Sequence, residues 1–130
     1  MKCLDSSFLV DYLDGEEATL VYLSENAEAP LYVPAIALYE IYEGAVHDDD
    51  DEPKATRQNL DWMDDVLPFS ETTALETARL QRSLLEAGSP LAPRDAMVAA
   101  TAREVGATLV SGDGDFLDDS VREVLDVETY

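Results

Sequence analysis

The sequence predicts one α/β domain in which a central, mostly parallel sheet is flanked by helices. Short strand-like runs and longer helix-like runs alternate along the chain, which is the pattern of α/β proteins. The length of 130 residues suits a single domain with its own core, and 46% of the residues are apolar. No internal repeat and no linker interrupts the pattern, so the domain is expected to span residues 1–130.

The first half of the chain is expected to contain two strands and three helices. Met1–Leu4 is a mainly apolar run that predicts the first strand. Ser6 or Ser7 is expected to cap a short helix, which the Asp14-Gly15 pair ends. The other elements expected here are a helix over Phe8–Leu13, a helix over Glu16–Glu25, a strand over Leu31–Val33, and a helix over Ala35–Val46 that is apolar on much of its circumference.

The second half of the chain alternates helical and extended signals after an acidic block, Asp48–Pro53, which is expected to be an exposed loop. Prolines and glycines supply most of the boundaries. The expected elements are a helix over Lys54–Asp65 with Leu60 and Met63 inward, an edge strand over Val66–Phe69, a helix over Glu71–Ala87 ended by Gly88, a helix from Pro93 to near Gly106, a strand over Ala107–Val110, and a last strand over Val124–Val127.

The net charge of −21 comes from 29 acidic and 8 basic residues. Repulsion between these charges should destabilise the compact state in dilute buffer. Salt shortens the Debye length to about 3 Å at 1 M and removes most of that penalty. Abundant acid with only two lysines resembles the composition of proteins from salt-accumulating microbes. The alternative is a local acidic patch for a basic partner, but the acids are spread over the whole chain.

Several classes of protein are excluded or disfavoured by composition. No apolar run approaches the ~18 residues of a membrane helix, and no signal peptide is recognisable. Cys3 is the only cysteine, which excludes an internal disulfide and argues against a cysteine-based zinc site. His47 is the only histidine and is expected to be a solvated loop residue, so a metal-free ribonuclease with two histidines is excluded. We therefore expect a cytoplasmic protein that does not contact membranes.

Four acidic residues occupy positions from which their carboxylates could lie close together in the folded domain. Asp5 closes the first strand, and Asp113 follows the strand that ends at Val110. Glu40 lies within an apolar helical run, and Asp95 opens a helix. Carboxylates at strand ends and helix starts can meet at one edge of an α/β sheet, and hard oxygen ligands suit Mg²⁺ or Mn²⁺. Taken singly, each acid also has a structural interpretation as a cap, a turn residue or part of a solvated helix face.

The sequence around each acid strengthens the joint interpretation, because four ordered motifs resemble those of PIN domains. The motifs are Leu4–Leu13, Glu40–Gly44, Asp95–Ala102 and Leu109–Phe116. The resemblance covers essentially the whole chain, which implies a PIN-like fold. The size and the absence of extra domains resemble the VapC-type toxin ribonucleases.

That resemblance implies a metal-dependent endoribonuclease with Mg²⁺ or Mn²⁺, an RNA substrate, a cognate antitoxin and a homodimer. It identifies Asp5, Glu40, Asp95 and Asp113 as the catalytic, metal-binding acids. Asp115 is a candidate additional ligand, although alternate residues of an extended chain point opposite ways, so Asp113 and Asp115 are not expected to reach one metal equally. Ser7 is expected to support the metal shell through its hydroxyl.

Some alternatives remain open at this stage. An acidic Mg²⁺-dependent phosphotransfer or receiver-type domain would share the acids, and a PIN-like fold could serve as a non-catalytic binding module. Arg94 could contact an RNA phosphate or form a surface ion pair. Aromatic side chains could stack on bases, but core packing is expected; they are Tyr39, Tyr42, Trp62, Phe69 and Phe116. The absence of a basic stripe is the main argument against a nuclease.

Overall fold

A five-stranded sheet forms the centre of the computed structural model, which describes residues 1–48 and 52–130. The strands lie in the order β3-β2-β1-β4-β5, and every pairing is parallel. Their bounds are β1 Lys2–Leu4, β2 Leu31–Pro34, β3 Asp65–Leu67, β4 Thr108–Val110 and β5 Val127–Glu128. The predicted α/β class is confirmed, and β3 lies at a sheet edge as expected.

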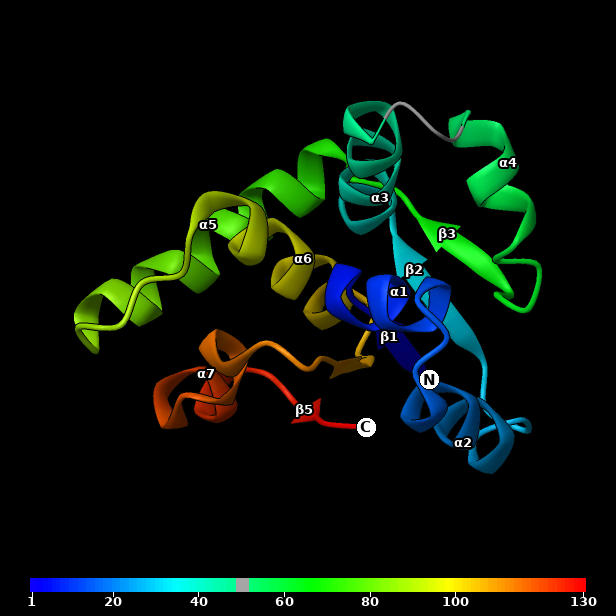
Figure 1. The fold of residues 1–130 in the computed structure, drawn as a ribbon. Helices are drawn as coiled ribbons and strands as arrows, with labels where there is room; N and C mark the ends of the chain where they lie inside the picture. Colours follow the sequence, from blue (N-terminus) through cyan, green and yellow to red (C-terminus); the bar gives the residue numbers. More distant parts are fainter. Residues whose placement is uncertain (49–51) are drawn as a thin grey trace.

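Helices occupy most of the segments between the strands (Figure 1). They are α1 Ser6–Leu13, α2 Glu17–Glu25, α3 Ala35–His47, α4 Pro53–Gln58, α5 Glu71–Glu86, α6 Pro93–Glu104, the 3-10 helix η1 Gly114–Leu117, and α7 Asp119–Val124. Figure 1 shows α5 and α6 side by side, with α3 and α4 together on another side of the molecule. Gly88 and Gly106 follow α5 and α6 with positive φ angles, which explains why both helices end where glycine was expected to end them.

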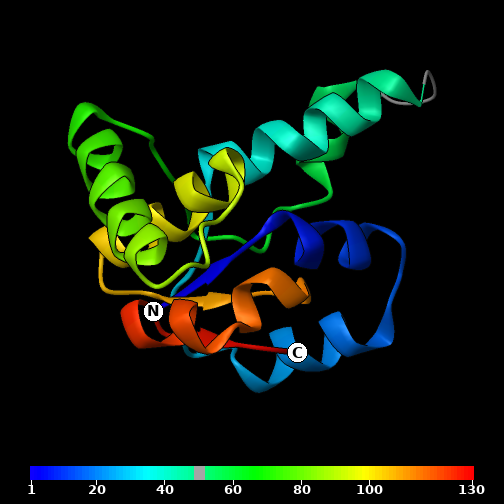
Figure 2. The same cartoon turned by 90° about the vertical axis from the view of Figure 1, so that its left-hand side faces the viewer.

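The central strands are buried because each has a paired neighbour on both sides and helices cover the two faces of the sheet (Figure 2). Cys3, Leu4, Leu109 and Val110 have no exposed surface. This explains why their sequences are continuous apolar runs without polar alternation. Phe8 of α1 is also fully buried, and the rings of Tyr22, Trp62 and Tyr130 meet it edge-on with centroids 4.7–6.1 Å away. This core supports the carboxyl ends of β1 and β4.

Two expected boundaries are wrong. The helix expected over Lys54–Asp65 ends at Gln58, and Leu60 and Met63 are buried in the turns that follow. The chain leaves the helix because Asp64 exchanges hydrogen bonds with Leu31, at 2.7 Å to its carboxylate and 2.8 Å from its backbone N–H. These contacts align the chain with β2, so the backbone adopts a strand conformation from Asp65 onward.

The end of the chain also differs from expectation. The residues from Asp119 to Val124 form a helix, and the last strand is restricted to Val127–Glu128. Asp118 caps this helix by accepting a hydrogen bond from the Ser120 N–H at 2.9 Å. Pairing with β4 starts afterwards, where the Leu109 N–H donates to the Asp126 carbonyl at 2.8 Å.

Helix α3 is less covered than its apolar sequence suggested. Figure 2 shows its far end extending away from the sheet, and Val46 near that end is 60% exposed. Tyr39 on the same helix is half exposed, which contradicts the expected core position, whereas Phe116 is buried. His47 is exposed as predicted, although it is the last residue of α3 and not part of a loop. Asp49, Asp50 and Asp51 of the acidic block lie outside the described residues.

Candidate metal centre

The strand order brings the predicted acids to one edge of the sheet. The chain leaves β1 toward β2 and later returns to β4 on the other side of β1, so the connections diverge at the carboxyl ends of β1 and β4. Ligands of open α/β sheets bind at such a switch point. Asp5 follows β1 directly, and Asp113 lies three residues after β4.

The other two acids reach the same edge on helices. Helix α3 starts directly after β2, so Glu40 in its second turn lies beyond the carboxyl end of that strand. Helix α6 leads back into β4 and runs opposite to it, which places its first turn, with Asp95, at the carboxyl edge. The topology therefore brings the predicted residues together.

Asp5 is the most enclosed of these acids, with 3% of its surface exposed. Its Oδ1 accepts hydrogen bonds from the Phe8 N–H at 3.2 Å and the Ser7 hydroxyl at 2.6 Å. Asp5, and neither Ser6 nor Ser7, is therefore the cap of α1, which corrects the expected cap. Burial raises the pKa of Asp5, the hydrogen bonds from Ser111, Ser7 and Phe8 oppose that rise, and the charge of Asp113 adds to it.

Two serines connect Asp5 to the turn that carries Asp113. Ser7 donates to Asp5 and accepts a hydrogen bond from the Gly112 N–H at 2.9 Å. Ser111 donates to the other oxygen of Asp5 and accepts from the Asp113 N–H at 2.9 Å. The sequence motifs predicted a role for Ser7 but none for Ser111, which is fully buried. A hydroxyl residue between a buried strand and an acidic turn was the available signal.

Asp95, Asp113 and Asp115 form the tightest group of carboxylates. One oxygen from each lies within 4.8 Å of the other two, which permits shared coordination of one ion. Asp113 and Asp115 reach a common point because the chain enters the 3-10 helix η1 directly after Asp113. Asp113 accepts a hydrogen bond from the Asp115 N–H at 2.9 Å and caps η1. That the two acids bind one metal unequally stays a prediction.

Glu40 lies beside this group and is held by the Ser6 hydroxyl, 3.3 Å from its Oε2. Burial raises the pKa of Glu40, the charges of Asp95 and Asp5 raise it further, and Ser6 and Arg94 lower it. Burial likewise raises the pKa of Asp95, and the charges of Asp113, Asp115 and Asp5 add to that rise. We call Asp5, Glu40, Asp95, Asp113 and Asp115 the acidic cluster, since their charges affect one another.

The donor set of the acidic cluster fits a divalent metal. All five side chains offer carboxylate oxygens, which are the preferred ligands of Mg²⁺ and Mn²⁺. The pKa values of Asp5, Glu40 and Asp95 are all raised, and only that of Glu40 is lowered in part by a nearby cation, Arg94. Repulsion among the remaining charges favours protonation, and a bound cation reverses that preference.

Arg94 itself makes the ion pair that was one of its two expected roles. Its Nη2 lies 3.4 Å from Glu43 Oε2, and its guanidinium carbon lies 5.5 Å from the centre of the Tyr39 ring. The Arg94 side chain nevertheless remains 53% exposed. Its position next to Asp95 leaves it at the rim of the acidic cluster.

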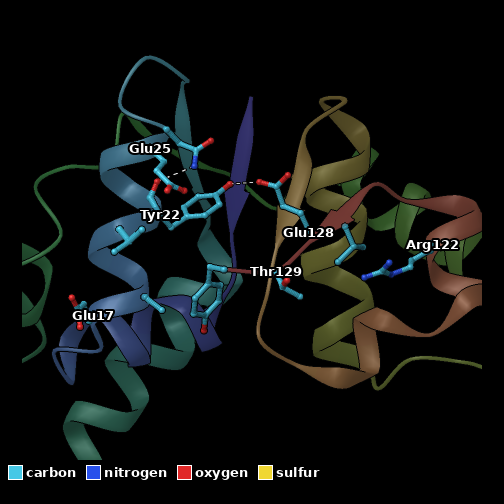
Figure 3. Close-up of a pocket in the computed structure, with 11 residues that line it drawn as sticks. Glu17, Tyr22, Glu25, Arg122, Glu128 and Thr129 are labelled. Carbon is cyan, nitrogen blue, oxygen red and sulfur yellow. Dashed lines mark hydrogen bonds between the residues drawn. The ribbon is translucent and has the colours of Figure 1, made fainter.

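A second charged region lies at another part of the sheet, beside a cleft of about 820 Å³ between α2, α7 and β5 (Figure 3). Figure 3 shows Tyr22 donating its hydroxyl hydrogen bond to Glu128. Lys2 Nζ contacts the same carboxylate at 2.8 Å. Burial alone would raise the pKa of Glu128, but the hydrogen bonds from Lys2 and Tyr22 and the charges of Lys2 and the N-terminus outweigh burial and lower it. We call Lys2, Tyr22 and Glu128 the paired cluster.

A parallel sheet with uncompensated carboxylates at its switch point defines a class of α/β proteins whose site is built for a cation. The model of the PIN domain matches residues 2–119. The chain therefore belongs to the PIN-domain family, as its motifs predicted. PIN domains of VapC toxins are nucleases, which are hydrolases.

Solved structures show the same fold over nearly the whole chain. FitAB bound to an IR36 DNA fragment gives a TM-score of 0.82 at 23% identity, covering 99% of this chain and 94% of that one. VapBC2 from Rickettsia felis, bound to a DNA fragment from its promoter, gives 0.78 at 18% identity, with 98% and 97% covered. DNA-bound VapBC from Salmonella typhimurium gives 0.78 at 19%, with 98% and 96% covered. A search among curated proteins found no match.

No helix within the described residues is long and apolar enough to cross a membrane.

Proposed function

We propose that this protein is a metal-dependent endoribonuclease that uses Mg²⁺ or Mn²⁺ to hydrolyse RNA phosphodiester bonds. The observation that carries the proposal is the acidic cluster at the switch point of a PIN fold. A non-catalytic module would gain nothing from clustered charges that repel one another. Family membership also leaves the receiver-type alternative without a supporting observation.

Each residue has a proposed role. Asp95, Asp113 and Asp115 hold the metal, since their oxygens already surround one point. Asp5 sits behind them and fixes the turn through Ser7 and Ser111. When bound, a divalent cation lowers the pKa of water and stabilises charge on phosphoryl oxygens.

Glu40 is the proposed general base, which takes a proton from the attacking water. Ser6 holds its Oε2, and its Oε1 is left to accept a proton from the attacking water. The water oxygen bonds to phosphorus, the bond from phosphorus to the 3′ oxygen breaks, and that oxygen receives the proton. The products are a 5′-phosphate, which retains the second water proton, and a 3′-hydroxyl.

The test is cleavage of total RNA in high KCl with and without EDTA. Cleavage should require Mg²⁺ or Mn²⁺ and stop in excess EDTA, and Asp95→Asn should be inactive under both conditions. Undiminished cleavage in EDTA would contradict the metal mechanism. Absence of cleavage with every divalent cation would favour the binding-module alternative.

We further propose that the protein is a dimeric, cytoplasmic toxin held inactive by a cognate antitoxin. The antitoxin partner is supported by the similar structures, which include VapBC and FitAB complexes. A partner's arginine or lysine inserted into the acidic cluster would substitute for metal charge. Co-purification with the neighbouring gene products tests this. If no small partner binds and expression alone does not slow growth while RNA cleavage is robust, the toxin role is wrong.

A further inference from the structure

Tyr39 and Arg94 form an exposed pair at the rim of the acidic cluster. Each is the residue directly before a member of that cluster, Glu40 on α3 and Asp95 on α6. Tyr39 is 50% exposed, and the Arg94 guanidinium lies over its ring at 5.5 Å. An aromatic ring and a guanidinium group therefore lie together, at cation–π distance, beside the proposed reaction centre.

The position of Arg94 is held without using up its hydrogen-bond donors. Glu43 Oε2 lies 3.4 Å from Arg94 Nη2, yet this oxygen accepts no hydrogen bond from any residue that the structure describes. The opposite charge keeps Arg94 near Tyr39, and the planar fork of its N–H groups stays available for another acceptor. By contrast, Arg103 Nε contacts Glu76 at 2.8 Å, a typical charged hydrogen-bond distance.

We propose that Tyr39 and Arg94 form a subsite for one unpaired nucleotide of the substrate, next to the scissile phosphate. This inference rests on the proposed ribonuclease function. The base stacks on the Tyr39–Arg94 pair, as unpaired RNA bases stack on aromatic rings and guanidinium planes. The free donors of Arg94 bind the adjacent phosphate. A base within a duplex cannot reach this surface, so the subsite selects single-stranded RNA.

This subsite also addresses the conflict between the charge of −21 and an RNA substrate. Binding that relies on many phosphate contacts weakens steeply with salt, because each contact releases a counterion. Stacking between a base and an aromatic ring does not depend on counterion release. A protein with one cation and one ring at its site can therefore retain its substrate at salt concentrations that screen its own repulsion.

The experiment measures cleavage of a 5′-fluorescein-labelled single-stranded oligoribonucleotide with Mg²⁺ in high KCl. Tyr39→Ala and Arg94→Ala should each raise KM by roughly tenfold, with a smaller change in kcat. Tyr39→Phe retains the ring and should have a clearly lower KM than Tyr39→Ala. Arg82→Ala is the matched control, because Arg82 pairs with Glu86 on the exposed face of α5. The same oligoribonucleotide hybridised to its complement should be a poor substrate.

Several outcomes overturn the subsite while leaving the nuclease intact: KM unchanged in both alanine variants, equal losses in Arg82→Ala, or duplex cleaved as well as single strand. A change in oligomeric state of Tyr39→Ala in size-exclusion chromatography would instead assign this face to contacts between copies. If the wild type cleaves no RNA, binding of the labelled oligoribonucleotide is measured by fluorescence anisotropy in Ca²⁺ for the wild type and Tyr39→Ala. Weaker oligoribonucleotide binding by Tyr39→Ala would support the subsite without the nuclease, and equal binding would overturn both.

Discussion

Asp95 and Glu128 are both acidic side chains beside the same parallel sheet, but their surroundings differ. In the paired cluster, Lys2 and Tyr22 bind the Glu128 carboxylate and lower its pKa. In the acidic cluster, burial and the neighbouring acids raise the pKa of Asp95. The paired cluster balances the Glu128 charge with donors from the same chain, whereas the carboxylates of the acidic cluster mainly face other carboxylates. An arrangement that is unfavourable in isolation indicates a ligand that completes it.

The largest effect expected from this comparison is on cleavage. Asp95→Asn should reduce RNA cleavage by at least ~100-fold, because it removes a proposed metal ligand while leaving the fold intact in high salt. Asp5→Asn should be similarly inactive, with some loss of stability as well, since its NH2 group replaces one of the two oxygens that accept the Ser7 and Ser111 hydroxyls. Single-turnover cleavage and circular dichroism measure the two effects.

Glu128→Gln is the matched control for these variants, because it changes an acid of the same sheet outside the acidic cluster. It should cleave RNA at the wild-type rate. Equal inactivation of all three variants would show that activity does not depend specifically on the acidic cluster.

The next effect separates Asp113 from Asp115. Asp113→Asn should weaken metal binding and cleavage more than Asp115→Asn, because Asp113 is half-buried and also caps η1, whereas Asp115 is exposed. Metal titration and single-turnover cleavage of the two variants test the order. The reverse order would mean that Asp115 is the principal ligand and that the fourth motif is aligned two residues too early.

The next effect is that of salt, which screens the repulsion among the exposed acids of the whole molecule. The melting temperature of the metal-free protein should rise as KCl increases from dilute buffer to molar concentrations, since screening relieves repulsion. Each 1 kcal/mol of relieved repulsion corresponds to about 4 °C in a domain of this size. An uncharged osmolyte at equal osmolality is the control. A flat profile in KCl would remove the basis for a salt-adapted composition.

The smallest expected effect is on the pH dependence of stability in EDTA. The pKa of Glu128 is lowered by folding, so its contribution is present above the unfolded value of about 4.3 and is lost as pH falls through the folded pKa. Glu128→Gln should therefore cost up to about 1 kcal/mol at neutral pH, given its partial exposure, and nothing in strong acid.

Asp95→Asn should show the opposite trend. The pKa of Asp95 is raised by folding, so the folded state binds more protons than the unfolded state above about pH 3.9. Its charged form destabilises the fold increasingly as pH rises through that window. Asp95→Asn should gain stability over the wild type as pH rises. Parallel pH profiles for the two variants would contradict the contrast between the clusters.

Local sequence signals predicted much of this architecture. The apolar runs at Met1–Leu4 and Ala107–Val110 contain the two central strands, and Gly88 and Gly106 mark the ends of two helices. The same signals placed Asp5, Glu40, Asp95 and Asp113 at positions that a parallel sheet brings together. These features follow from interactions within a few residues and from the geometry of α/β connections, so a single sequence carries them.

The tertiary structure decided the rest, because it depends on contacts between residues far apart in the chain. Asp64 is not helical, although its sequence had predicted a helix, because it forms hydrogen bonds with Leu31. Glu128 is paired because Lys2 lies beside it in the folded sheet. Ser111 joins the site through Asp5, and Tyr39 meets Arg94 only when α3 and α6 are in place. Residue identity and spacing identify which side chains are able to bind a cation or a base, but only folding sets the distances between them.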